Sequence, residues 1–214
     1  MKKHFGGVRA LEGIDLALEA GRVYCIVGPN GCGKSTLLGV ISGELAPTAG
    51  SVWFGGNNIT GMAPARIARM GVLRKFQAPS IFPSLTVAEN VEAALMARTV
   101  PWGRLVARRH LKRLGELLDL VGLQHRAGLV AEELSHGEKQ WLEISMLLAE
   151  ESPLLLLDEP TAGMTIRETQ QTVELIRRIA SEHGRTILAI EHDMSFVEGL
   201  ECEVIALLRG RVLC

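Results

Sequence analysis

The sequence predicts an α/β fold with a mostly parallel β-sheet, because short apolar runs recur along the chain with longer helical patterns between them. The runs span residues 23–27, 154–157 and 186–190. Continuous apolar runs are typical of parallel strands buried on both faces, whereas strands with one exposed face alternate polar and apolar residues. Strands that alternate with helices along the chain favour an α/β core.

A helical segment interrupts this pattern midway. Between residues 86 and 122, apolar residues recur every three or four positions, as in amphipathic helices. They include Val87, Val91, Leu95, Leu111, Leu114, Leu118 and Val121. We therefore expect one domain over residues 1–214, with a core of residues 1–77 and 136–214 and an inserted α-helical subdomain over about 78–135.

The composition excludes several classes of protein. Hydrophobic residues make up 47% of the 214 residues and charged residues 22%, as in a globular chain. The formal net charge is −1 and only 4% of residues are aromatic, so we expect no nucleic-acid partner. No apolar run approaches the roughly 20 residues of a membrane span, which predicts a soluble chain. Cysteines at positions 25, 32, 202 and 214 match no zinc or disulfide framework and favour a reducing cytoplasm.

The strongest motif follows the first apolar run and fits G-x-x-x-x-G-K-[ST] without a gap. Its residues are Gly28, Pro29, Asn30, Gly31, Cys32, Gly33, Lys34, Ser35 and Thr36. Glycines let the backbone curl so that its N–H groups point at phosphate oxygens, and the following helix adds the positive end of its dipole. Lys34 supplies a charge for the β and γ phosphates, and the Ser35 hydroxyl is a ligand for Mg²⁺. The motif predicts a P-loop NTPase core that binds ATP with Mg²⁺.

Acidic residues and a histidine follow the two other apolar runs. Asp158 and Glu159 come directly after residues 154–157, and His192 follows residues 186–190. Ligands in open α/β sheets bind at the carboxyl ends of strands, so these side chains are expected to face the phosphates. We predict Asp158 in the Mg²⁺ shell, Glu159 orienting or deprotonating the attacking water, and His192 at the γ phosphate.

A second anion-binding feature lies at residues 134–140, whose sequence is Leu-Ser-His-Gly-Glu-Lys-Gln. Ser135 followed three residues later by Glu138 predicts a capping box at the start of a helix. The small Gly137 permits close approach to this helix start, where the dipole favours an anion. Since the chain already has one phosphate loop, a second nucleotide could use this feature.

This ordered set of motifs resembles the nucleotide-binding subunit of an ATP-binding-cassette (ABC) transporter over almost the full chain. In that family two such domains dimerise head to tail, and each signature motif closes on the γ phosphate held by the other. The resemblance implies that role for Ser135, His136, Gly137 and Glu138. It also implies that Phe5 stacks on adenine, and that Gln77 joins the two lobes, contacts the metal and contributes to catalysis.

The resemblance also implies an assembly and a place in the cell. The partners would be a second ABC ATPase subunit, transmembrane permease subunits and, indirectly, a solute-binding protein. The chain would lie peripherally on the cytoplasmic face of the inner membrane, and its fold would include an antiparallel β edge region. Relatives begin and end with further strand segments, so the resemblance predicts that both termini are truncated here.

Within the family, His136 and the segment 139–144 resemble the urea importer's ATPase subunit, in the group that takes up branched-chain amino acids and amides. Thr165 departs from many relatives, which carry an aspartate there, and Glu138 replaces the usual glutamine. We therefore predict an ATP hydrolase that powers urea import. The alternatives are the ATPase subunit of a branched-chain amino acid importer, and a truncated nucleotide-binding module with impaired hydrolysis.

Overall fold

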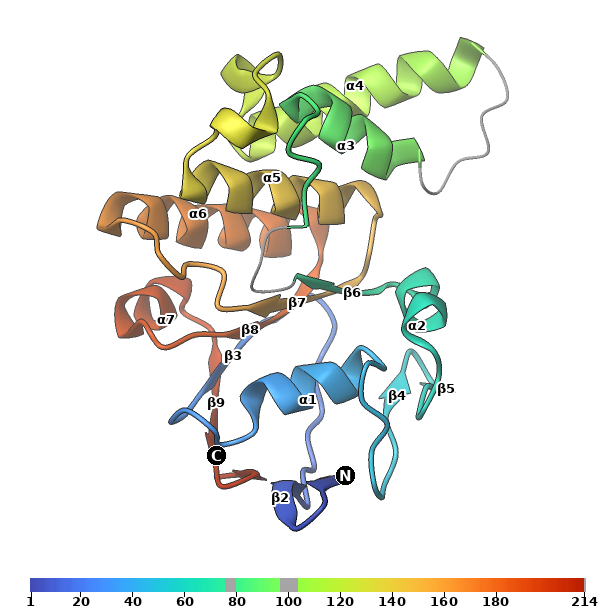
Figure 1. Cartoon of the computed structure of the whole chain (residues 1–214), viewed down its shortest axis with the longest axis vertical. Coiled ribbons are helices and arrows are strands. Elements are labelled where there is room, and N and C mark those ends of the chain that lie inside the picture. Colours follow the sequence, from blue (N-terminus) through green and yellow to red (C-terminus); the bar gives the residue numbers. More distant parts are fainter. Residues whose placement is uncertain (76–79, 97–103, 214) are drawn as a thin grey trace.

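The computed structural model of the chain describes residues 1–75, 80–96 and 104–213. Within them, a six-stranded sheet forms the centre of the molecule (Figure 1). All neighbouring strands are parallel except β10 and β9. In spatial order the strands are β10 (Arg211–Val212), β9 (Glu203–Leu208), β3 (Val23–Val27), β8 (Thr186–Ile190), β7 (Leu154–Asp158) and β6 (Val72–Lys75). The predicted mostly parallel sheet is confirmed, and its three apolar runs are the adjacent strands β3, β8 and β7.

Two short antiparallel pairs accompany this sheet. β1 (Lys2–Phe5) pairs with β2 (Val8–Glu12), and β4 (Trp53–Phe54) pairs with β5 (Asn57–Asn58). The end of β2 is joined to the β9–β10 turn, because the Glu12 N–H donates to the Gly210 carbonyl at 2.7 Å. These pairs confirm the predicted antiparallel β region.

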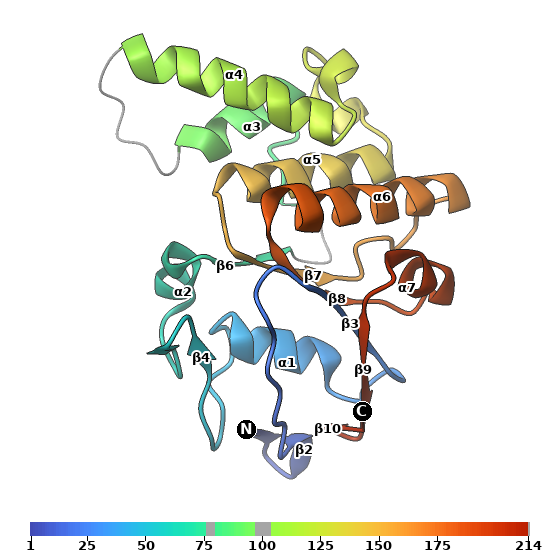
Figure 2. The ribbon, with the colours of Figure 1, turned by 180° about the vertical axis from the view of Figure 1, so that it is seen from behind.

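Helices cover both faces of the sheet. α1 (Lys34–Ile41) lies on one face, and α5 (His136–Ala149) and α6 (Ile166–His183) lie on the other (Figure 1). α3 (Val87–Met96) and α4 (Arg104–Leu120) stack on α5, away from the sheet, in both views (Figures 1 and 2). The other described helices are α2 (Pro64–Met70), α7 (Met194–Leu200) and two 3-10 turns, Gln124–Arg126 and Ala131–Glu133. None of the helices in the described residues is long and apolar enough to cross a membrane.

The segment predicted to be a helical insertion, about residues 78–135, contains α3, α4 and both 3-10 turns, and no strand among its described residues. The division of the chain into two structural units at those positions stays a prediction. Gln77 lies outside the described residues.

The core has two halves, one on each face of the sheet. Along β7, Leu155 and Leu157 pack into the cluster that contains residues of α5 and α6. Leu154 and Leu156 pack into the other cluster, with Leu37 of α1. Successive side chains of a strand point to opposite faces, so a continuous apolar run fills both halves of the core.

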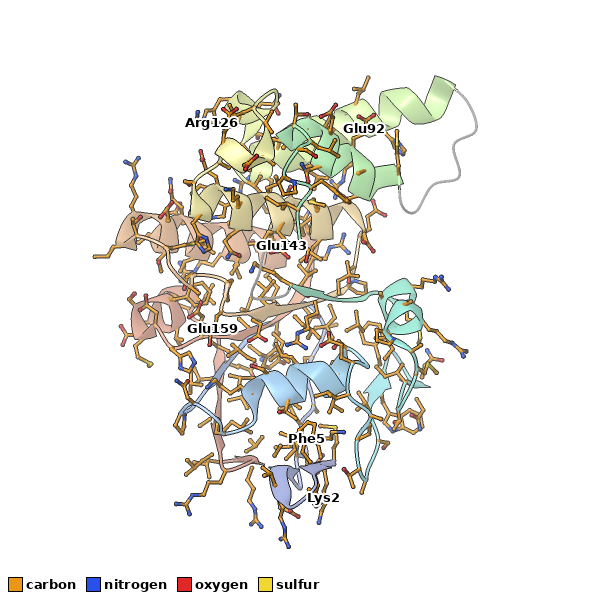
Figure 3. The ribbon with its side chains drawn as sticks, viewed as in Figure 1. Lys2, Phe5, Glu92, Arg126, Glu143 and Glu159 are labelled. Carbon is orange, nitrogen blue, oxygen red and sulfur yellow. The ribbon has the colours of Figure 1, made fainter. Side chains whose placement is uncertain are left out.

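A buried ion pair connects β6 to α5. Lys75 Nζ lies 3.4 Å from Glu143 Oε2, and both side chains are buried (Figure 3 labels Glu143). Burial lowers the pKa of the Lys75 ammonium and raises the pKa of the Glu143 carboxyl, and in each case the oppositely charged partner counteracts the shift. Glu143 Oε1 also accepts the Ser80 N–H at 3.1 Å. The pair fixes the position of β6 relative to α5, because either charge alone would be costly to bury.

Lys75→Met is expected to lower the free energy of unfolding by about 3–5 kcal/mol, because Glu143 then stays buried without this cation. Urea unfolding followed by circular dichroism measures the loss. The double variant Lys75→Met/Glu143→Leu should regain most of it, since apolar side chains of similar volume replace the charges. Lys112→Met, at an exposed position, is the control. A double variant no more stable than Lys75→Met would contradict the ion-pair explanation.

Candidate active site

The predicted phosphate loop lies between the end of β3 and the first turn of α1, and the backbone itself requires its glycines. Gly28 has φ 152° and Gly33, the N-cap of α1, has φ 110°. A Cβ atom on Gly28 would lie 2.2 Å from the Leu207 carbonyl oxygen, and one on Gly33 would lie 2.5 Å from that of Ala10. Both positions therefore exclude any larger residue. The loop is also anchored from outside, because the Gly210 N–H donates to the Cys32 carbonyl at 2.8 Å.

Lys34 is held over this loop. Its side-chain ammonium donates to the carbonyl oxygens of Gly28 at 2.8 Å and Pro29 at 3.1 Å, and the residue is only 6% exposed. α1 has no acidic residue in its first turn, so nothing there offsets the positive end of its dipole. The loop thus combines a fixed ammonium with a helix N-terminus, which is the equipment for binding phosphate oxygens.

Ser35 and Asp158 lie together beside the loop. Ser35 Oγ donates to Asp158 Oδ1 at 3.4 Å, which joins the start of α1 to the end of β7. Arg74 on β6 fixes the other carboxylate oxygen, with its Nη2 2.7 Å from Asp158 Oδ2, and its Nη1 donates to Glu44 at 2.8 Å. Asp158 is thereby buried as a paired carboxylate.

These oxygens fit Mg²⁺. A hydroxyl and a carboxylate are hard donors, and a small hard cation uses few protein ligands beside water and phosphate. The described residues contain no group of three or more His, Cys, Asp or Glu that could hold a metal, so Ser35 and Asp158 would share the cation with nucleotide and water.

Glu159 and His192 meet at the carboxyl edge of the sheet. His192 Nε2 lies 3.1 Å from Glu159 Oε1, and both side chains are partly exposed (Figure 3 labels Glu159). Glu159 has φ 49°, a left-handed conformation that costs about 1–3 kcal/mol for a non-glycine residue and is common at functional sites. Its N–H donates to the Ile190 carbonyl at 3.0 Å, which ties the end of β7 to the end of β8. The carboxylate of Glu159 and the imidazole of His192 therefore form one pair at this edge of the sheet.

The signature segment forms the start of α5. Ser135 is the N-cap, and the predicted capping box with Glu138 is confirmed: Ser135 Oγ accepts the Glu138 N–H at 3.2 Å, and the Glu138 carboxylate accepts the Ser135 N–H at 2.9 Å. Gly137 is needed for packing, because a Cβ there would lie 2.4 Å from the Glu168 carboxylate. Since α5 and α1 cover opposite faces of the sheet, the signature segment does not meet the phosphate loop of its own chain (Figure 1).

Phe5 lies at the end of β1, 45% exposed, below α1 in the view of Figure 3. Lys3 Nζ sits 4.8 Å from the centre of its ring. An exposed aromatic face of this kind is able to take a base, but its role here stays a prediction.

Sequence reasoning missed three residues that shape the site: Arg74, Thr161 and Glu191. Arg74 pairs with Asp158, and the Glu191 carboxylate accepts both the N–H and the hydroxyl of Thr161. For Arg74 and Glu191 the sequence did offer a signal, because each charged residue lies directly next to apolar strand residues. A charge in such a position is carried toward the interior and requires a partner there.

A phosphate loop whose serine contacts the carboxylate at the end of another parallel strand is typical of a P-loop nucleotide hydrolase. The family model described as "ABC transporter" matches residues 11–162, and the chain belongs to this family. Within it the chain is an ATP hydrolase of the ABC type.

Individual relatives agree with this assignment. The high-affinity branched-chain amino acid transport ATP-binding protein LivG of Escherichia coli is 33% identical over 219 residues, covering 98% of this chain and 86% of LivG. CbiO1 from Clostridium perfringens, part of the ABC transporter complex CbiONQ, has a TM-score of 0.89 at 29% identity, covering 100% of this chain and 84% of that one. A dimeric ATP-binding cassette in a post-hydrolysis state, bound to ADP and Pi, has a TM-score of 0.83 at 27% identity, covering 100% and 93%.

Ser35→Ala is expected to abolish the gain in ATP affinity that Mg²⁺ provides, at least roughly tenfold, because a protein ligand of the cation is lost. ATP affinity in EDTA should not change, since Lys34 and the backbone N–H groups remain. Fluorescent ATP binding with and without Mg²⁺ measures both values, with Ser51→Ala as the control. Equal Mg²⁺ dependence in Ser35→Ala and the unchanged chain would exclude this role.

Proposed function

We propose that the chain is the ATP-binding and ATP-hydrolysing subunit of an ABC importer, working as half of a dimer with transmembrane permease subunits. The observation that carries the dimer is the separation of two anion-binding features on opposite faces of one sheet. The phosphate loop precedes α1 and the signature segment begins α5. One chain cannot bring its phosphate loop and its signature segment to the same nucleotide. In a head-to-tail dimer, the phosphate loop of one chain and the signature segment of the other can meet at each of the two nucleotides.

The proposed chemistry follows from the residues at the carboxyl edge. Gly28 to Thr36 hold the phosphates, with Lys34 on the β and γ groups. Ser35 and Asp158, together with Gln77, hold Mg²⁺, which would neutralise the charge of the phosphates when bound. Glu159 orients the attacking water and accepts its proton. His192, 3.1 Å from Glu159, contacts the γ phosphate and keeps that carboxylate in place.

The second subunit contributes the signature segment, in which Ser135 to Glu138 close on the γ phosphate. Phe5 stacks on the adenine of its own nucleotide. Homodimeric and heterodimeric pairings satisfy this arrangement equally. The dimeric ADP-bound relative supports the assembly, and CbiO1 supports a place in a transporter complex.

A groove of about 290 Å³ lies between α3 and α5, next to the end of β6. Its lining combines apolar residues such as Phe82 and Met146 with charged ones such as Glu150. Phe82 is 52% exposed. We place the permease contact here, because β6 leads directly into the segment that contains Gln77. The subunit would then lie peripherally on the cytoplasmic face of the inner membrane, with any solute-binding protein acting only through the permease.

Among solutes, branched-chain amino acids have the better support. LivG is named for their transport and shares 33% identity over nearly the whole chain. The urea prediction rests only on His136 and the sequence of residues 139–144, and these relatives do not support it. The truncated module with impaired hydrolysis is the weaker alternative, and the contacts of Ser35 with Asp158 and of His192 with Glu159 support hydrolysis.

Glu159→Gln is expected to bind Mg-ATP and to accumulate as a dimer, because every phosphate contact remains while water is no longer deprotonated. Light scattering with and without ATP measures the dimer, and phosphate release should fall at least roughly a hundredfold. Glu159→Gln/Lys34→Ala should stay monomeric, since it lacks the lysine that holds the nucleotide.

In the unchanged chain, the rate of hydrolysis should rise more steeply than linearly with subunit concentration. A linear rise that still depends on Lys34, together with a monomeric Glu159→Gln variant, would exclude the shared site.

The solute is tested with this chain assembled in liposomes with its permease subunits and solute-binding protein. We expect leucine, isoleucine or valine to stimulate ATP hydrolysis several-fold through the solute-binding protein, and urea to have no effect. Lys34→Ala in the same complex is the blank. Stimulation by urea alone would restore the urea prediction and overturn the amino acid proposal.

A further inference from the structure

The short segment that follows Glu159 is held at two points by hydrogen bonds that the chemistry proposed above does not use. The first point is Thr161. Its N–H and its hydroxyl both donate to Glu191 Oε1, at 2.9 and 2.6 Å. Glu191 Oε2 accepts the N–H of His192 at 3.0 Å. Glu191 is 4% exposed, so one buried carboxylate bridges the segment after Glu159 and the residue that contacts it.

The second point is Ala162, and it is held from the signature segment. His136 Nε2 lies 2.9 Å from the Ala162 carbonyl oxygen. A carbonyl only accepts, so Nε2 carries the proton and donates it. Gly163 leaves room for the ring, since a Cβ there would lie 3.4 Å from His136. The first residue of α5 is therefore tied to the segment that leaves the catalytic glutamate.

Gln140, one turn along α5, supports this position of the ring. It is 1% exposed, and its side-chain amide lies 3.3 Å from His136 Nε2. Its Oε1 atom has no hydrogen-bond partner among the described residues. Because His136 Nε2 carries the proton, the amide oxygen of Gln140 is the atom of that side chain that can accept from it.

We propose that Glu191 and His136 are positioning residues that clamp residues 161–162, so that the orientation of Glu159 and the start of α5 depend on each other. This inference rests on the proposed function, since it assigns the signature segment to the nucleotide of the other subunit. Glu159 lies two residues from the first point and is itself in a left-handed conformation. A conformation of that cost persists only where the surroundings hold it.

The clamp has a consequence for the dimer. When the start of α5 closes on the partner's nucleotide, His136 transmits its position to Ala162 and hence to the Glu159 of the same chain. Each site would then report its occupancy to the other through one hydrogen bond of 2.9 Å. If this hydrogen bond forms only when the start of α5 is closed on a nucleotide, its free energy contributes to the coupling free energy between the two nucleotide sites.

Three variants of the full chain test the clamp. Glu191→Gln keeps an acceptor for Thr161 but presents an amide N–H₂ to the His192 N–H. His136→Leu keeps the side-chain volume and removes the donor, whereas His136→Gln keeps a donor within reach of the carbonyl. Glu198→Gln, at an exposed position on α7, is the matched control for charge removal.

Two readouts are measured: amide hydrogen exchange of residues 159–164 and 135–140, and the pair of kcat and Kd for Mg-ATP. Glu191→Gln should speed exchange of residues 159–164 on the order of tenfold, and His136→Leu should speed exchange of both segments together. In both variants kcat should fall on the order of tenfold while the Kd of the isolated subunit changes less than about twofold. His136→Gln should restore exchange and most of kcat.

Unchanged exchange in His136→Leu would overturn the clamp, and so would a parallel loss of Mg-ATP affinity, which signals general unfolding. The exchange measurement needs no hydrolysis. If the unchanged chain hydrolyses no ATP but the exchange pattern is as expected, the clamp stands and the proposed function fails. If hydrolysis is present and the exchange pattern is absent, the reverse holds.

Discussion

The register of three parallel strands is the constraint on which the site depends. Ile190 of β8 is opposite Ile26 of β3 on one side and opposite Asp158 of β7 on the other. The three strands therefore end at the same level, and the chain emerges from each one within a residue or two of that edge. A slip of one residue would turn every side chain of a strand to the opposite face. The apolar faces that fill both halves of the core thus also fix where Asp158 and Glu159 lie.

Placing charge at this edge requires partners on both faces of the sheet. Arg74 and Lys75 are adjacent on β6, so their side chains leave the strand on opposite sides. Arg74 reaches Asp158 and Glu44 beside α1, and Lys75 reaches Glu143 on α5. Each buried charge is compensated, and each ion pair also joins two elements. β6 thereby connects Asp158 to α5, the helix that begins with the signature segment.

The sequence predicted the features that depend on residues close together along the chain, and it did not predict contacts between residues far apart along the chain. The apolar runs at 23–27 and 186–190 correspond in full to strands, and the phosphate loop and the capping box depend on residues within a few positions of each other. β6 was not predicted, because two of its four residues are charged and their partners lie far along the chain. The contact between Thr161 and Glu191 was missed for the same reason, since these two residues meet only when β7 and β8 pair. The urea prediction came from the residues around His136, and that segment contacts no solute. Its sequence therefore carries little information about the solute, and the relatives favour branched-chain amino acids.

The capping box at α5 bears on the proposed contact between this helix start and a partner's nucleotide. A helix leaves its first N–H groups without intrahelical acceptors, and capping here satisfies the N–H of Glu138. The N–H groups of His136 and Gly137 precede it, at the positive end of a helix of 14 residues. Gly137 carries no side chain, and a Cβ there would lie 2.4 Å from the Glu168 carboxylate, so this helix start packs closely against α6. The chain's own phosphate loop precedes α1, on the other face of the sheet, so in the proposed dimer the anion at this helix start is the γ phosphate held by the second subunit.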